Sequence, residues 1–290
     1  MIRQNNSSKA IILDTDIGYD PDDLFALLFL YKLAPDNIEL IITANEIGHK
    51  RTRFLKQTLG SMKVDHINIA EGSDLGLDKF TVDELLEQTG QLKHVDFIAE
   101  MKAIIDSHED VIYIGIGGFT NLSKFIEHYP DDTKKMKIFV MGGAINYERH
   151  AEWIEFNVKI DTKSAQKVLE SGCDISYIMA QTTHNPIYEV TADHRLYKKL
   201  AESDLPEHQL LLKHLDLWFA KTGHGTSMHD PLTVAAAFGL DYVDFNKSKA
   251  SFENKRFKLD ENGCLIKWSD PESKAKEFMD FLEKILFGQI

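Results

Sequence analysis

The chain has 290 residues, of which 43% are hydrophobic and 10% aromatic, a composition that supports a packed core and excludes a disordered protein. Its formal charge of −13 argues against a nucleic-acid backbone or an anionic membrane as the main partner. The two cysteines, Cys173 and Cys264, argue against a disulfide scaffold or a cysteine-ligated zinc site. The polar N-terminus has no apolar signal segment, and no apolar run reaches membrane-spanning length, so we expect a cytoplasmic protein.

Short β-rich apolar runs alternate with helical stretches over the first 180 residues. The predicted strands are Ala10–Leu13, Ile38–Thr43, His66–Ala70, Val111–Ile116, Lys137–Met141 and Ile175–Met179. The predicted helices are Asp22–Leu33, Lys50–Met62, Val82–Ile105 in two pieces, Asn121–His128 and Thr162–Glu170. This alternation predicts an α/β fold of three layers, with a mostly parallel central sheet and helices on both of its faces.

The pattern changes after Gln181. Helices are predicted at His194–Glu202, His208–Lys221, Pro231–Phe238 and Glu272–Leu286. Residues 249–268 alternate around Asp260-Glu261-Asn262-Gly263, whose Asn-Gly pair predicts a C-terminal antiparallel hairpin. Because no linker or internal repeat divides the chain, we expect a single domain over residues 1–290, with residues 1–8 as a disordered tail.

Five aspartates crowd the junction between the first strand and the first helix: Asp14, Asp16, Asp20, Asp22 and Asp23. Clustered carboxylates raise one another's pKa or need a counter-charge, and a hard divalent cation takes oxygen ligands. Helix capping is the simpler explanation for the last three acids, since aspartate suits an N-cap and the first helical turn. Capping does not explain the first two acids, at the strand end, where burying a carboxylate is costly.

Three later segments also join a strand or loop to polar residues. The glycine-rich turn Gly115–Asn121 can bind a phosphate, offer carbonyls to a metal, or serve packing alone. Glu155 and Asn157 flank Phe156, an arrangement that suits a polyol above an aromatic ring but is also ordinary surface polarity. A third segment, Ser227–Leu232, opens a helix with a His-Asp pair. Three histidines stand where a strand or loop enters a helix: His49, His184 and His229.

With these segments in order, the chain resembles the inosine-uridine preferring nucleoside hydrolase family. The motifs that carry the resemblance are Asp14-Thr15-Asp16-Ile17-Gly18, Asp22-Asp23-Leu24, Gly117-Gly118-Phe119-Thr120-Asn121, Val140–Gly143, Glu155-Phe156-Asn157 and His229-Asp230. They span nearly the whole chain in the order of the family.

The resemblance implies an enzyme of nucleoside salvage that hydrolyses a ribonucleoside to free base and ribose with a bound calcium ion. It implies that the ion is held by the carboxylates of Asp16, Asp23 and Asp230 and by the carbonyl of Ile116. It also implies a homodimer or homotetramer.

The remaining site residues follow from the same resemblance. Asp20 or Asp22 would hold the ribose 2′-hydroxyl. Asp14 would not bind the metal itself but would lie next to the residues that do. The other candidates for substrate binding are Asn45, Met141, Glu155, Asn157 and His229.

The chemistry that the resemblance implies is coherent. Cleavage of the C–N bond builds positive charge on the ribose, which surrounding acids stabilise. The ion would position a water, Asp16 would act as the general base, and His229 would protonate the leaving base.

Two departures from the family pattern concern substrate choice. The run Tyr19-Asp20-Pro21-Asp22-Asp23 carries two residues more than the usual signature, so that Asp20 competes with Asp22 for one role. The segment Thr43-Ala44-Asn45-Glu46 is about two residues shorter than the usual one, which leaves Asn45 and Glu46 as alternatives for a sugar contact.

Two other functions compete with nucleoside hydrolysis. A phosphohydrolase of the haloacid-dehalogenase type also places Asp-x-Asp after its first strand and uses magnesium, but Ile17-Gly18-Tyr19 does not fit its signature. A non-catalytic ribose or nucleoside binder on the same fold is the second alternative.

Overall fold

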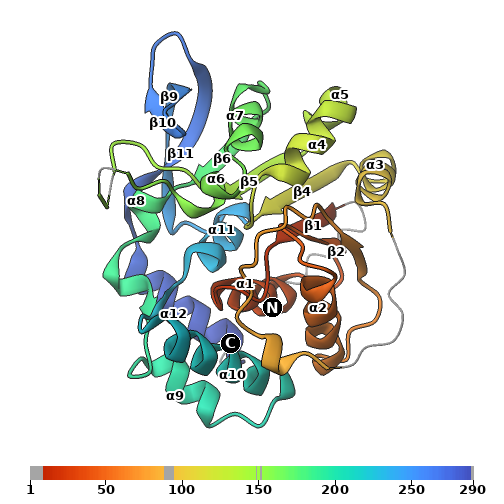
Figure 1. The fold of residues 1–290 in the computed structure, drawn as a ribbon, viewed down its shortest axis with the longest axis vertical. Coiled ribbons are helices and arrows are strands. Elements are labelled where there is room, and N and C mark those ends of the chain that lie inside the picture. The colour runs from red at the N-terminus through yellow and green to blue at the C-terminus, as the bar shows by residue number, and fades with distance from the viewer. Residues whose placement is uncertain (1–8, 88–94, 148, 151, 289–290) are drawn as a thin grey trace.

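The computed structural model of the chain describes residues 9–87, 95–147, 149–150 and 152–288. Nine of the described strands form one sheet in the order β10-β9-β11-β6-β5-β4-β1-β2-β3 (Figure 1). The parallel part consists of β1 (Lys9–Thr15), β2 (Ile38–Thr43), β3 (Asn68–Glu71), β4 (Asp110–Gly115), β5 (Lys137–Met141), β6 (Ile175–Ile178) and β11 (Cys264–Ser273). The predicted mostly parallel α/β sheet is therefore confirmed.

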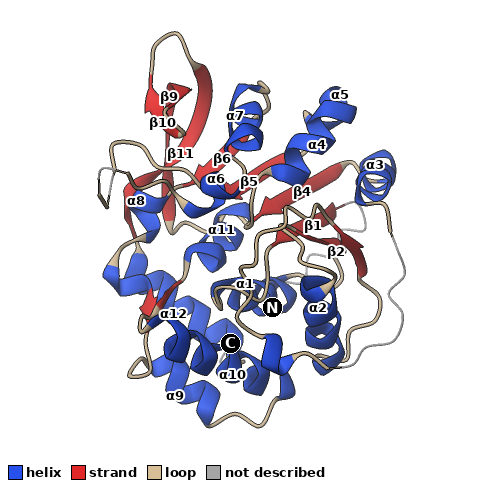
Figure 2. Ribbon diagram, in the orientation of Figure 1, coloured by secondary structure: helices blue, strands red, loops and turns tan. Residues whose placement is uncertain are grey.

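Helices cover both faces of this sheet (Figure 2). One face packs against α1 (Asp22–Leu33), α2 (Lys50–Ser61), α10 (Pro206–Thr222), α11 (His229–Ala237) and α12 (Ala275–Leu286). The other packs against α3 (Phe97–Ser107), α4 (Thr120–His128) and α7 (Thr162–Glu170). The shorter described elements are α5 (Pro130–Thr133), α6 (Phe156–Ile160), α8 (Ala180–Thr183), α9 (Arg195–Ala201), two 3-10 turns (Asp83–Leu85, Pro186–Tyr188) and the small antiparallel pair β7 (Glu189–Val190) and β8 (Thr226–Ser227).

The first strand shows why both faces carry a core. Successive side chains of a strand point to opposite faces, so Ile11 and Leu13 join the core under α1 whereas Ala10 and Ile12 join the core under α4. All four are fully buried. Such a strand consists of consecutive apolar residues, as expected in a sheet that helices cover on both faces.

The predicted C-terminal antiparallel strands are confirmed, and the chain turns at Asp260–Gly263, where the Gly263 N–H donates to the Asp260 carbonyl at 2.9 Å, but the two strands that this turn joins do not pair with each other. The tight hairpin turn is Asn254-Lys255, with φ of 50° and 63°, between β9 (Val243–Glu253) and β10 (Arg256–Leu259). Both β10 and β11 pair with β9, and Asp260–Gly263 crosses between them. An Asn-Gly pair favours a turn locally, but strand order depends on which strands meet in space.

The stretch predicted to be helical in two pieces over residues 82–105 is confirmed only in part. The structure has only a 3-10 turn at Asp83–Leu85 and then α3 from Phe97, while residues 88–94 lie outside the described part of the chain. The expected tail, residues 1–8, lies outside it too, and a single domain stays a prediction. None of the described helices is long and apolar enough to cross a membrane.

Candidate functional site

The carboxyl ends of the central strands open into a cavity of about 350 Å³. Asp16 lies just beyond β1, Ile116 just beyond β4, and Met141 ends β5. Helices α1 and α11 point their N-termini toward the same place, since they begin at Asp22 and His229 and pack against each other. The lining includes Asp16, Tyr19, Asp20, Asp22, Asp23, Ile116, Met141, Arg149, Trp153, Glu155, Phe156, Asn157, His184, Trp218, His229 and Asp230.

Three carboxylates form the centre of this cavity. Asp22, Asp23 and Asp230 each offer an oxygen atom, and these atoms lie within 4.8 Å of one another. The three residues are only 2–3% exposed. Two of them open α1 and the third lies in the first turn of α11, more than 200 positions later, so that the packing of the two helices creates the group.

Burial and mutual repulsion act together on these acids. Burial is the main cause that raises the pKa of Asp22, Asp23 and Asp230 well above the ordinary value. The charges of neighbouring carboxylates, Asp16 and Asp20 among them, raise these pKa values further. Capping of α1 does not account for the group of three, since Asp20 accepts the hydrogen bond from the Asp22 N–H and Asp230 belongs to another helix.

Asp16 lines the same cavity but lies outside that group of three. Burial raises the pKa of Asp16, and the guanidinium of Arg51, 4.0 Å from Oδ2, partly counters this shift. Gly18, two residues on, has φ of 97°, and a β-carbon there would meet the ring of Phe80 at 2.4 Å. The loop between β1 and α1 therefore requires glycine at this position.

Asp20 and Asp14 have partners within the protein. The Asp20 carboxylate accepts hydrogen bonds from the Thr226 hydroxyl and from the backbone N–H of Asp22, and burial raises the pKa of Asp20 to about 6. The Asp14 carboxylate accepts from the Tyr113 hydroxyl and from Asn121 Nδ2, and burial raises the pKa of Asp14 to about 7. Asp14 lies outside the lining of the cavity, on the side of the sheet under α4.

The Glu155-Asn157 segment forms one wall. Glu155 caps α6 by accepting hydrogen bonds from the backbone N–H groups of Gly143, Asn157 and Val158. Asn157 Nδ2 donates to the carbonyl oxygens of Ile116 at 3.1 Å and Met141 at 3.2 Å. These bonds join the ends of β4 and β5 to α6 and hold the wall in place.

Two histidines face each other in the cavity. His229 Nδ1 lies 2.5 Å from the Thr183 hydroxyl, and His184 Nδ1 lies 3.1 Å from the Tyr147 hydroxyl. Burial lowers the pKa of His229 to about 3 and that of His184 to about 4. Both imidazoles are therefore neutral near pH 7. His49, in contrast, is exposed and pairs with Glu71 outside the cavity.

Asn45 and Glu46 do not line the cavity. Glu46 is fully buried, and its carboxylate accepts hydrogen bonds from Thr43, Ile47, Arg51 and Thr52 at the start of α2. Asn45 is also buried and is not part of the lining. The shortened loop after β2 thus stabilises α2, so that neither side chain reaches the space where the other candidates meet.

Several lining residues carry no signal in the sequence. Tyr19 stacks on Phe156 with ring centroids 5.2 Å apart and meets Trp218 edge-on at 5.4 Å. Arg149 and Trp153 come from the loop that follows β5. These residues are aromatic or basic side chains from distant segments, and no motif spacing relates them.

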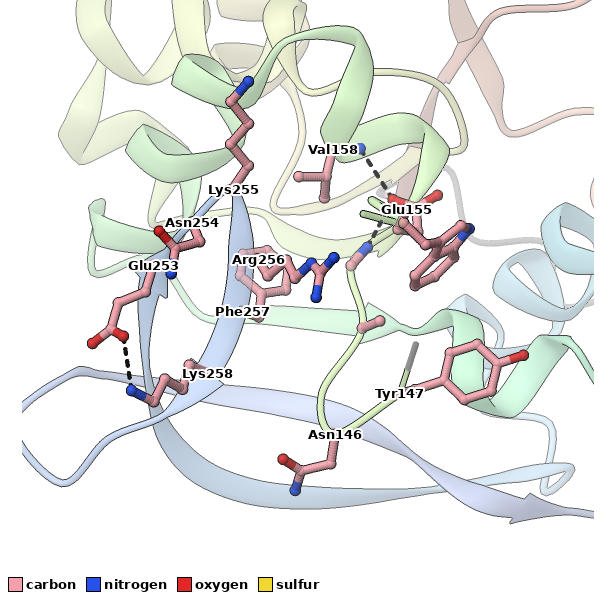
Figure 3. Close-up of a pocket in the computed structure, with 13 residues that line it drawn as sticks. Asn146, Tyr147, Glu155, Val158, Glu253, Asn254, Lys255, Arg256, Phe257 and Lys258 are labelled. Atoms are coloured by element: carbon pink, nitrogen blue, oxygen red, sulfur yellow. Dashed lines mark hydrogen bonds and ion pairs between the residues drawn. The ribbon is translucent and has the colours of Figure 1, made fainter. Parts of the chain in front are cut away.

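A second cavity of about 520 Å³ adjoins the first and shares Trp153 and Glu155 with it (Figure 3). Its far wall is the hairpin turn, from Glu253 to Lys258, and the Glu253 and Lys258 side chains form an ion pair at 2.8 Å. Figure 3 shows the hydrogen bonds that the Glu155 carboxylate accepts from the backbone N–H groups of Gly143 and Val158.

Known proteins resemble this chain in sequence and in fold. The chain is 25% identical over 252 residues to the pyrimidine-specific ribonucleoside hydrolase RihA of Salmonella paratyphi C (strain RKS4594), an alignment that covers 78% of each chain. Among solved structures, a plant nucleoside hydrolase, PpNRh1, superposes with a TM-score of 0.81 at 17% identity, covering 96% of this chain and 99% of its own. The purine-preferring ribonucleoside hydrolase from Gardnerella vaginalis gives a TM-score of 0.76 at 17% identity, covering 97% and 98%.

The family comparison is the most direct. The sequence profile described as inosine-uridine preferring nucleoside hydrolase matches residues 11–277, which include every motif on which the resemblance was based. This match decides against the phosphohydrolase alternative. The chain belongs to the inosine-uridine preferring nucleoside hydrolase family and is a hydrolase that acts on N-glycosyl bonds.

Proposed function

We propose that the chain hydrolyses a ribonucleoside to free base and ribose in the acid-lined cavity, with a calcium ion held by its carboxylates. The observation that carries this proposal is the meeting of Asp22, Asp23 and Asp230, from two distant helices, in one cavity with His229. A charged group of this kind, buried in a cleft, is typical of a functional site.

The donor set fits a hard divalent cation, because every candidate ligand is an oxygen atom. The proposed ligands are the carboxylates of Asp16, Asp23 and Asp230 and the carbonyl of Ile116. That carbonyl accepts a hydrogen bond from Asn157 Nδ2 and keeps a second lone pair. When bound, the ion would compensate the carboxylate charges, orient the sugar diol and a water, and lower the pKa of that water.

Asp16 is proposed as the general base. It lines the cavity, and the guanidinium of Arg51 favours its anionic form, which a base needs. In the reaction, the water oxygen bonds to the anomeric carbon, its proton passes to Asp16, and the C–N bond breaks with its electron pair on the base. The positive charge that develops on the ribose is stabilised by the buried carboxylates around it.

The sugar contacts divide between two walls. Asp22 is the better candidate for the 2′-hydroxyl, because Asp20 already accepts hydrogen bonds from Thr226 and from the Asp22 backbone. Glu155 accepts three backbone hydrogen bonds and retains acceptor capacity for a ribose hydroxyl. Asn157 and Met141 complete this wall beneath the sugar.

His229 is proposed to assist departure of the base. If the Thr183 hydroxyl donates to Nδ1, the neutral ring carries its proton on Nε2 and can donate it to the leaving base. Since burial lowers the pKa of His229 to about 3, the group acts as a neutral hydrogen-bond donor near pH 7.

The test is a panel of purine and pyrimidine ribonucleosides assayed by liquid chromatography with calcium, with chelator, and with calcium restored. We expect free base and ribose in the presence of calcium and a loss of activity in chelator that added calcium reverses. An Asp230→Asn variant that folds and releases no base is the matched control. Ribose binding without release of base from the wild-type protein would overturn the proposal and favour a binding protein.

A further inference from the structure

Arg51 is a fully buried arginine next to Asp16, outside the lining of the acid-lined cavity. It lies in the first turn of α2, and its side chain reaches back beneath the loop that carries Asp16. None of the family motifs in the sequence includes it. A buried arginine is costly unless all its donors are used, so the partners of the guanidinium indicate its purpose.

The guanidinium joins three segments that meet behind the cavity. Nη1 donates to the carbonyl oxygens of Asp16 and Ile17, the latter at 2.9 Å, in the loop after β1. Nε donates to the carbonyl of Asn45 at 2.8 Å, in the loop after β2. Nη2 donates to the carbonyl of Lys79 at 2.7 Å, in the long loop after β3. One planar side chain thus fixes three loop backbones relative to one another.

The hydrogen bonds from Arg51 to the three loops form a clasp. The backbone at Asn45 shows that this clasp holds a residue in a conformation that is locally unfavourable. Asn45 has φ of 46°, and neither polar atom of its buried side chain has a hydrogen-bond partner among the described residues. A residue in this conformation persists only where its surroundings fix it. The bond from Arg51 Nε to its carbonyl, together with the Glu46 carboxylate on the backbone N–H of Arg51 at 3.0 Å, provides that fixation.

The charge of Arg51 is also close to the chemistry. Nη2 lies 4.0 Å from Asp16 Oδ2, and both side chains are almost completely shielded from water. If packing were the only requirement, a leucine or methionine would fill this space without the free-energy cost of removing a charge from water. The structure instead retains a cation whose side chain donates four hydrogen bonds to backbone carbonyl groups, those of Asp16, Ile17, Asn45 and Lys79.

We infer that Arg51 is a positioning residue. Its planar guanidinium fixes the position of the Asp16 loop, and with it the Asp16 carboxylate, relative to Asp23 and Asp230. This inference rests on the proposed function, because it assigns the purpose of the clasp to the reaction at Asp16. A one-ångström displacement of a reacting group can reduce a rate about 10²-fold, so a loosened loop is expected to lower kcat.

The experiment compares Arg51→Lys with two controls on the same helix. Lysine keeps the charge but cannot donate to the four carbonyl groups in three loops that the planar guanidinium reaches. Arg53→Lys makes the same substitution at an exposed position, and Leu59→Ala removes a buried side chain far from the clasp. Each protein is measured by amide hydrogen exchange, thermal unfolding, and kcat and KM for nucleoside hydrolysis.

For Arg51→Lys we expect faster exchange of the backbone amides at residues 16–19, 44–46 and 79–81 together. We also expect kcat to fall about 10- to 100-fold with little change in KM. Arg53→Lys should match the wild type in every measurement, and Leu59→Ala should lower the unfolding temperature while kcat of the folded protein is kept.

Unchanged exchange in the three segments of Arg51→Lys would overturn the inference. So would a fall in kcat no larger than that of Leu59→Ala, since a purely structural role predicts equal losses. If the wild-type protein releases no base from any nucleoside, the proposed function fails. The exchange data then still decide whether the clasp exists.

Discussion

The ring of His184 stands edge-on to the ring of His229, with centroids 5.1 Å apart and an interplanar angle of 80°. Each ring has its own hydroxyl partner, Tyr147 for His184 and Thr183 for His229. The proximity of the two rings contributes to the lowered pKa of His229, after burial. A pair of neutral imidazoles therefore lines the cavity together with the acids.

Replacement of His229 by alanine should slow release of the base about 10²- to 10⁴-fold, the usual contribution of a positioned proton donor. Calcium affinity, measured by titration calorimetry, should stay at the wild-type value, because His229 is not among the proposed ligands. His184→Ala should have a smaller effect on kcat. His49→Ala, which alters an exposed histidine outside the cavity, serves as the control. Equal rates for His229→Ala and the wild type would refute the role.

Replacement of Asp22 by asparagine should have opposite effects on stability and on activity. It removes one of the buried like charges that raise the pKa values of their neighbours. In chelator we expect the unfolding temperature to rise by about 2–4 °C, which corresponds to about 1 kcal/mol in a chain of this size. In the calcium-loaded protein kcat should fall. Asp131→Asn, at a carboxylate that is 92% exposed, should change neither quantity.

The stability of the protein in chelator should decrease as the pH is raised from about 6 to about 8. Burial raises the folded-state pKa values of Asp20 to about 6 and of Asp14 to about 7, so the folded protein binds more protons than the unfolded chain in this range. The stability that these acids contribute is complete below their unfolded pKa and is lost as the pH rises through the folded pKa.

The buried histidines make the stability increase with pH, in the opposite direction to the acids, but mainly at lower pH. His184 and His229 have lowered pKa values, so their contribution is present above about pH 6.5 and is lost as the pH falls toward the folded values. Thermal unfolding measured across this range with chelator and with saturating calcium checks the sign. A rise in unfolding temperature from pH 6 to pH 8 in chelator would contradict the expectation that the buried acids determine how stability changes with pH in this range.

Gly117 should not tolerate a methyl group. A β-carbon there would lie 2.6 Å from the β-carbon of Ala44 and 3.0 Å from the backbone nitrogen of Asp16, so the added atom would push the Asp16 loop. Gly117→Ala should cost about 1–3 kcal/mol of stability and should lower kcat at temperatures where the protein remains folded.

The matched control for this substitution is Gly60→Ala. Gly60 lies within α2, and a β-carbon there meets nothing within 4 Å. Alanine favours a helix more than glycine does, so this variant should be about 1 kcal/mol more stable with unchanged activity. Chemical denaturation and steady-state kinetics on both variants separate overpacking near Asp16 from a general effect of the substitution.

The sequence by itself determined the fold class and most of the elements. The apolar runs of β1, β2, β4 and β5 and the amphipathic stretches of α4 and α7 have local periodicities that are readable without the structure, and α1 begins at an obvious acidic junction. The motifs also led to the family, because their order along the chain is a sequence property. The cavity does bring together Asp16, Asp23, Ile116, Glu155, Asn157, His229 and Asp230, as the resemblance implies.

Other features were decided only by tertiary structure. The strand order places β10 and β11 on opposite sides of β9 and adds a hairpin turn at Asn254-Lys255, and it depends on which strands pair with β9. Glu46, an alternative for the sugar, proved to cap α2, while Arg51, outside every motif, proved to hold the loop of Asp16. Local propensity and spacing act over a few residues, whereas these roles arise from contacts between residues tens of positions apart, which only the packing of helices on the sheet creates.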